Sequence, residues 1–155
     1  MKILAPVLRE IREQARLGYP HECCGFVLGR AGRPGPDSRP FEGLKILPAD
    51  NSRSGERRGR RFRIEPEDLL AAEETALAEG LDVVAVYHSH PDHPAAPSAS
   101  DLAGALPFYR YVIVGVDGGR PGETTNWVLS DDRATFEAEP LELLNPAEAG
   151  GDPPG

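Results

Sequence analysis

The stretch "DVVAVYHSHPDHPAAPSASD", residues 82–101, decides the fold that we expect for this chain of 155 residues. It begins as an apolar run, which is typical of a buried β-strand, and this run leads directly into His88 and His90. A proline-rich loop follows, and Ser98 then precedes a short apolar segment that suits a helix. The pattern therefore places polar side chains at the end of a strand and at the start of the next helix.

Three of these side chains form a candidate metal site. His88 and His90 are separated by one residue, so both side chains point to the same face of the predicted strand. Asp101 follows His90 by eleven residues and offers a carboxylate, which the stiff proline-rich loop can return to the strand. Two nitrogens and one oxygen suit zinc, and three protein ligands leave one position open for a water. Zinc lowers the pKa of such a water to about 7, as hydrolytic sites require.

Each of these residues also has a purely structural interpretation. His-x-His alone is a weak signal, because a histidine after a strand is usually just a polar loop residue. Ser98 and Asp101 form the S-x-x-D pattern of a capping box, and helix capping alone could explain both. The two roles are compatible, since a capping serine still presents its hydroxyl near the site. His93, in the same loop, is predicted to be an exposed loop residue.

A second buried strand is predicted in "HECCGFVLGR", residues 21–30, and Glu22 lies at its beginning. A charged side chain is costly there unless it is paired or functional, which makes Glu22 our candidate for the general base of a hydrolase. The alternative is an exposed glutamate at a strand end. Cys23 and Cys24 are adjacent, imply no disulfide framework and are predicted to be small core residues. We expect His21 to face solvent.

The remaining pattern mixes helices with strands, which favours an α+β (mixed α/β) fold with helices packed on a mixed sheet. A single domain is expected at 1–140, followed by a disordered tail at 141–155 that is rich in proline, glycine and acidic residues. The periodicity predicts helices at 5–18, 66–79 and about 98–106, and strands at 23–30, 41–48, 61–64, 82–90, 109–116, 124–130 and 134–140.

Composition excludes several classes of protein. The net charge of −8, from 17 basic and 25 acidic side chains, argues against general nucleic-acid binding. One exception is "RSGERRGRRFR", residues 53–63, which is either a solvated loop or a docking patch for an acidic partner. The chain has no apolar run of about 18 residues and no apolar signal-peptide core, so we expect a cytoplasmic protein without a membrane partner.

The combination of "ECCGFVLG", "HSHP" and "PSASD" resembles the JAMM (MPN-plus) zinc metalloproteases, whose pattern is Glu, then His-x-His, then Ser-x-x-Asp. The resemblance runs from about Glu22 to Trp127, and the short chain is similar to the prokaryotic stand-alone branch. It implies a curved mixed β-sheet flanked by helices, the JAMM/MPN-like (cytidine-deaminase-like) architecture. Cys24-Gly25 matches the Cys-Gly that is structural in this family.

The resemblance also implies a role for each site residue. His88, His90 and Asp101 would bind one zinc ion per chain. Glu22 would hydrogen-bond the water at the metal and act first as general base and then as acid. Ser98 would stabilise the oxyanion of the tetrahedral intermediate.

The implied activity is that of a JAMM-type isopeptidase or peptidase. Its substrate would be a ubiquitin-like or sulfur-carrier protein, cleaved after the C-terminal Gly-Gly, and cysteine would be released from a carrier–cysteine adduct. Two alternatives belong to other classes: a non-catalytic MPN scaffold that binds partner proteins, and a zinc amidase that acts on a small molecule. Scaffold members usually lose metal ligands, and none is missing here.

Overall fold

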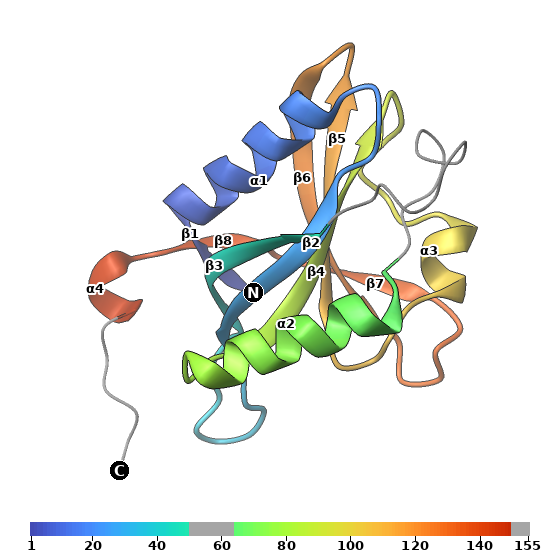
Figure 1. Cartoon of the computed structure of the whole chain (residues 1–155). Helices are drawn as coiled ribbons and strands as arrows, with labels where there is room; N and C mark the ends of the chain where they lie inside the picture. The colour runs from blue at the N-terminus through green and yellow to red at the C-terminus, as the bar shows by residue number, and fades with distance from the viewer. Residues whose placement is uncertain (50–63, 150–155) are drawn as a thin grey trace.

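An eight-stranded mixed sheet forms the centre of the computed structural model, which describes residues 1–49 and 64–149 (Figure 1). Within these residues the strands lie in the order β7-β6-β5-β4-β2-β3-β1-β8. The strands are β1 (Lys2–Leu4), β2 (Cys24–Arg30), β3 (Glu42–Ala49), β4 (Asp82–Pro91), β5 (Arg110–Asp117), β6 (Arg120–Leu129), β7 (Phe136–Glu139) and β8 (Glu142–Leu144).

The strand that carries the two histidines lies inside the sheet. β4 pairs antiparallel with β2 and parallel with β5, so that Cys24 and Ile113 flank His88 on its two sides. Every residue of β4 from Val83 to His90 is buried, which explains the continuous apolar run of this segment. A strand that is paired on both sides gives its last residues a fixed direction, and it therefore sets where the histidine side chains point.

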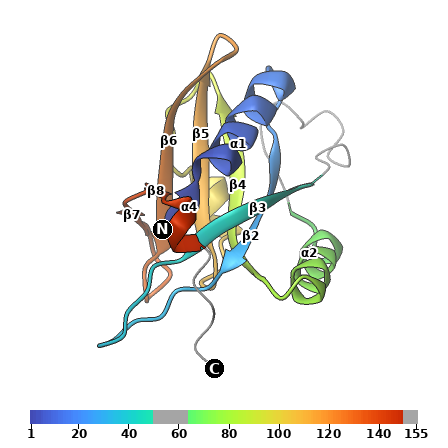
Figure 2. The same ribbon diagram turned by 90° about the vertical axis from the view of Figure 1, so that its left-hand side faces the viewer.

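Helices α1 (Ala5–Gly18) and α2 (Pro66–Ala78) cover opposite faces of this sheet (Figures 1 and 2). α1 buries Val7, Ile11 and Ala15, the spacing that predicts an amphipathic helix. α2 buries the small residues Ala72 and Ala76 against the other face. Both helices agree with the ranges that the periodicity predicts, and the mixed sheet with helices on its faces confirms the expected fold class.

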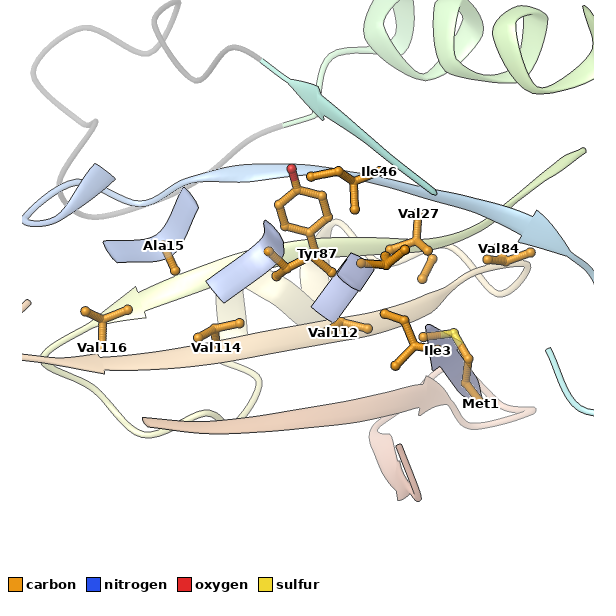
Figure 3. Close-up of a cluster of buried hydrophobic side chains, with 13 residues drawn as sticks. Met1, Ile3, Ala15, Val27, Ile46, Val84, Tyr87, Val112, Val114 and Val116 are labelled. Atoms are coloured by element: carbon orange, nitrogen blue, oxygen red, sulfur yellow. The ribbon is translucent and has the colours of Figure 1, made fainter. Parts of the chain in front are cut away.

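The core beneath α1 gathers side chains from the N-terminal strand, the helix and the central strands (Figure 3). Tyr87, which precedes His88, is fully buried in it, and its hydroxyl donates a hydrogen bond of 2.5 Å to Gln14 Oε1 on α1. Gly25 leaves room for this ring, because a Cβ there would lie 2.5 Å from the Tyr87 hydroxyl oxygen. The core thus fixes β4 against both β2 and α1 directly beside the histidines.

The structure differs from two predictions about helix α3 and the C-terminal tail. The helix after the proline-rich loop, α3 (Ala99–Ala103), ends earlier than expected, at a C-cap on Gly104. Part of the tail predicted to be disordered is ordered: β8 pairs with β1, and α4 (Pro146–Ala149) follows it. Residues 150–155 and the arginine-rich segment 53–63 lie outside the described residues, and the single domain at 1–140 stays a prediction.

Across residues 1–49 and 64–149, no helix combines the length and the apolarity that crossing a bilayer requires.

Candidate metal centre and active site

His88 and His90 occupy the end of β4 and share one face of it. Only 1% of His88 and 7% of His90 are exposed. Ser89 points to the other face, where its hydroxyl accepts a hydrogen bond of 2.9 Å from the backbone N–H of Cys23. This alternation brings the two imidazole Nε2 atoms to 3.0 Å from one another. The predicted common face of the two histidines is therefore present.

Asp101 comes from the first turn of α3 and meets the same two rings. Its Oδ1 lies 3.3 Å from His88 Nε2, and its Oδ2 lies 3.2 Å from His90 Nε2. The carboxylate also accepts a hydrogen bond of 2.7 Å from the backbone N–H of Ser98, and the Ser98 hydroxyl accepts one of 3.1 Å from the N–H of Asp101. The capping box and the cluster with the histidines exist together, so capping alone does not account for Asp101.

The three side chains match the donor set and the spacing of a zinc site. Ligand atoms of His88, His90 and Asp101 all lie within 4.8 Å of one another, and all three residues are largely shielded from solvent. Two atoms bound tetrahedrally to zinc at about 2.0–2.1 Å lie about 3.3–3.4 Å apart. The two ring nitrogens lie 3.0 Å apart, and they lie 3.3 and 3.2 Å from the two different oxygens of Asp101, so the donors are spaced on the scale of a zinc site. These residues therefore fit the metal.

A backbone carbonyl fixes which nitrogen of His90 faces the cluster. His90 Nδ1 lies 2.8 Å from the carbonyl oxygen of Pro94. A carbonyl oxygen can only accept, so Nδ1 carries a hydrogen, and Nε2 is the nitrogen of His90 that faces the cluster. Pro94 is a supporting residue that sequence reasoning missed, because proline in a loop signals a turn and says nothing about where its carbonyl points.

For His88 and Asp101, electrostatics favour the protonation states that bind a cation. Burial lowers the pKa of His88, which favours its neutral imidazole. Burial alone would raise the pKa of Asp101, but hydrogen bonds with His88 and His90 outweigh it and hold the pKa of this carboxyl well below its usual range. A neutral imidazole and an ionised carboxylate are the forms that coordinate divalent metals.

Glu22 approaches the cluster from the segment that leads into β2. Cys24 pairs with His88, and the Cys23 carbonyl accepts a hydrogen bond of 3.0 Å from the N–H of Ser89. The ladder with β4 ends at Cys24, and half-buried Glu22 lies two residues before it. Burial lowers the pKa of His90, but hydrogen bonds with Asp101 and a backbone carbonyl, together with the charges of Asp101 and Glu22, leave it raised. Glu22 is thus close enough to act on the cluster electrostatically.

The other candidates lie outside the cluster. Ser98 and His93 are exposed, as is His21, and His93 contributes no ligand atom to the group of three. Cys24 is buried, while Cys23 is half-buried with a thiol whose pKa is raised by burial, so neither is poised as a thiolate nucleophile.

The comparisons with known proteins define the class of the chain. The family described as prokaryotic homologs of the JAB domain matches residues 4–130, and the chain belongs to this family. The chain is therefore a metalloprotease of the JAMM type, the class that its Glu, His-x-His and Ser-x-x-Asp pattern predicts.

Several relatives carry names that describe an activity. The chain is 30% identical to a desampylase of Pyrococcus furiosus over 118 residues, which span 76% of this chain and 74% of the relative. It is 46% identical to a probable TtuB-protein conjugate cleaving protease of Thermus thermophilus over 59 residues, which span 38% of this chain and 40% of that protein.

Solved structures confirm the architecture. A solution structure of a Salinibacter ruber protein is 42% identical, covers 94% of this chain and 93% of its own, and superposes with a TM-score of 0.71. A crystal structure of a JAB1/MPN domain protein from Archaeoglobus fulgidus is 20% identical, covers 94% of this chain and 100% of its own, and has a TM-score of 0.57. The JAMM/MPN-like fold expected from the sequence is therefore correct.

Proposed function

We propose that this protein is a zinc-dependent peptidase that hydrolyses the bond after the C-terminal Gly-Gly of a ubiquitin-like protein. The observation that carries the proposal is the cluster of His88, His90 and Asp101, in which two ring nitrogens and a carboxylate face a common point. The relatives supply the substrate class, because one is named a desampylase and the other a protease that cleaves TtuB-protein conjugates.

His88, His90 and Asp101 would hold a single zinc ion. Zinc in a three-ligand site acts as a Lewis acid and makes water reactive near neutral pH. The tether from His90 Nδ1 to the Pro94 carbonyl and the tether from the Ser98 N–H to Asp101 would keep the donors aimed at the ion.

Glu22 and Ser98 would perform the proton transfer and the charge stabilisation. Glu22 would take a proton from the attacking water and deliver it to the leaving nitrogen as the carbon–nitrogen bond breaks. The Ser98 hydroxyl accepts a hydrogen bond from Asp101 N–H, so its own hydrogen can be donated to an oxyanion that forms on the substrate carbonyl. The products would be a free amine and the ubiquitin-like protein with a C-terminal carboxylate.

The finer assignment is a sulfur-carrier protein joined to cysteine through its terminal Gly-Gly. The released amine would then be free cysteine. A small-molecule amidase remains the alternative in another class. A scaffold without catalysis is disfavoured, because a complete donor set is present and assembled.

The test compares three substrates with zinc-loaded and chelator-treated protein. The substrates are a ubiquitin-like conjugate, a carrier–cysteine adduct and a small dipeptide amide. We expect zinc-dependent cleavage of the protein substrates, and loss of cleavage when the terminal Gly-Gly of the carrier is replaced by Ala-Ala. Faster turnover of the adduct than of the conjugate would support the finer assignment. Turnover of the small amide alone, or no turnover by zinc-loaded protein, would contradict the proposal.

Ser98→Ala is expected to keep zinc but to lower kcat by about 10²–10³, the range for one oxyanion donor. The substitution also removes the N-cap oxygen, which costs about 1 kcal/mol of stability, so thermal unfolding must be measured beside kinetics. Ser98→Thr keeps both the cap and the hydroxyl and serves as the matched control, with activity near that of the wild type. Equal kcat values for Ser98→Ala and Ser98→Thr would remove Ser98 from the mechanism.

A further inference from the structure

The residue two positions after His90 makes an unusual set of contacts. Asp92 has a φ of 56°, one of two non-glycine residues with positive φ in the described part of the chain. Aspartate tolerates this left-handed conformation better than most residues do. Its Oδ2 accepts a hydrogen bond of 2.7 Å from the Tyr19 hydroxyl, and its Oδ1 accepts one of 2.9 Å from the N–H of Gly118. We call Tyr19, Asp92 and Gly118 the clasp.

The clasp joins three segments that are distant in sequence. Tyr19 is the C-cap of α1 and lies three residues before Glu22. Gly118 lies in the turn between β5 and β6, where Gly118 and Gly119 both have positive φ. The Tyr19 ring packs over that turn, because a Cβ on Gly119 would lie 3.5 Å from the ring. In Figure 1 the end of α1, the loop after β4 and the β5–β6 turn lie at the same end of the sheet.

Around Glu22, the described chain is held by hydrogen bonds and by the packing of Tyr19 and Cys23 against the core beneath α1. Towards β2 it is fixed by two hydrogen bonds between Cys23 and Ser89. Between α1 and Glu22, the N–H of His21 donates a hydrogen bond of 2.8 Å to the Gly18 carbonyl. The clasp is the link that runs from this side directly to the loop that follows His90. We expect its loss to loosen residues 19–22 relative to the loop after His90, while β4 and α3 still hold the histidines and Asp101.

We propose that Tyr19 and Asp92 are positioning residues that set the Glu22 carboxylate relative to the histidine cluster. This inference rests on the proposed function, in which Glu22 handles the proton and the cluster holds zinc. Neither residue touches the reacting atoms. A misplacement of about 1 Å in a catalytic group can lower a rate about a hundredfold, so two exposed hydrogen bonds at this position can matter for turnover.

Three substitutions separate the hydrogen bonds from the backbone conformation. Tyr19→Phe removes only the bond to Asp92. Asp92→Gly removes both bonds but accommodates positive φ without strain. Asp92→Asn keeps both, because its oxygen can accept from Gly118 and its amide can donate to the Tyr19 oxygen. Arg133→Gly is the matched control, because Arg133 is the other non-glycine residue with positive φ and lies in the β6–β7 turn at the opposite end of the sheet.

In zinc-loaded protein we expect Tyr19→Phe to lower kcat about tenfold and Asp92→Gly up to about a hundredfold, with KM nearly unchanged. Asp92→Asn and Arg133→Gly should remain within about twofold of the wild type in kcat. Zinc stoichiometry and the visible spectrum of cobalt-substituted protein should not change in any of the four. Amide hydrogen exchange at residues 21–23 should accelerate in Tyr19→Phe and Asp92→Gly alone. In a Glu22→Gln background neither substitution should lower kcat further, which a merely structural role would not predict.

The outcomes distinguish this inference from the function on which it rests. Wild-type protein that binds no zinc or cleaves no conjugate would overturn the proposed function, and the positioning role with it. Active wild-type protein with unchanged kcat and unchanged exchange in Tyr19→Phe and Asp92→Gly would overturn the clasp alone. Additive losses in the Glu22→Gln background, or loss of zinc from the clasp variants, would also overturn it.

Discussion

Replacing His88 with alanine is expected to leave the protein without stoichiometric zinc and without detectable conjugate cleavage. Removing one of three protein ligands should weaken zinc affinity by well over about 100-fold, because the loss of a residue that merely supports a ligand already costs about 10–100-fold. Metal analysis after dialysis against a weak chelator measures the first effect, and the cleavage assay measures the second. His88 is 1% exposed, so thermal unfolding must be recorded to separate ligand loss from a damaged core.

His93→Ala is the matched control for this experiment. It removes an imidazole from the same loop that lies on the surface and supplies no donor to the cluster. We expect His93→Ala to retain one zinc ion per chain and normal turnover. A folded His88→Ala protein that still binds one zinc ion with unchanged affinity would show that the cluster is not the metal site.

Replacing Glu22 with glutamine should lower kcat by about 10²–10⁴ while zinc binding is retained. Glutamine preserves the size of the side chain but cannot accept a proton from water at neutral pH. Because His88, His90 and Asp101 come from β4 and α3, the ligands do not depend on Glu22 for their positions. Steady-state kinetics with metal-loaded protein measures the effect, and KM should change little if Glu22 acts mainly in the transition state.

The control for Glu22→Gln is Glu123→Gln, which makes the same chemical change at an exposed position on β6. This variant should keep the wild-type kcat. Wild-type activity in Glu22→Gln would remove the general-base assignment. A loss of zinc from Glu22→Gln would instead make Glu22 a support of the metal site.

The sequence predicts the elements whose pattern is local. The apolar spacing of Val7, Ile11 and Ala15 identifies α1, and the unbroken apolar run before His88 identifies β4. β1 and β8 escape prediction because strands of three residues carry no readable alternation, and their pairing joins residues about 140 apart in sequence. Residues 142–144 and 146–149, within the tail expected to be disordered, form β8 and α4, and β8 depends on its pairing with β1.

The candidate site likewise contains residues that the local sequence pattern predicts and residues that it does not. Residue type and spacing predict the cluster of His88, His90 and Asp101, because a strand period and a capping box determine where these side chains point. The roles of Tyr19 and Asp92 are not readable in this way, because their hydrogen bond joins the ends of two elements that meet only in the folded chain. An aspartate directly after His-x-His-Pro is a turn signal. The neighbouring sequence does not indicate which groups its carboxylate will hydrogen-bond in the folded chain.

Each donor of the metal cluster is anchored to the chain's own backbone. His88 is fixed by the ladders with β2 and β5, His90 by the Pro94 carbonyl, and Asp101 by the Ser98 N–H. Small zinc-folded modules, in contrast, unfold when their ion is stripped. We therefore expect zinc, in the proposed site, to be loaded and removed without unfolding of the chain. The supply of zinc in the cell would then limit the rate of turnover. Protein without zinc would stay folded and could become active again when zinc is supplied.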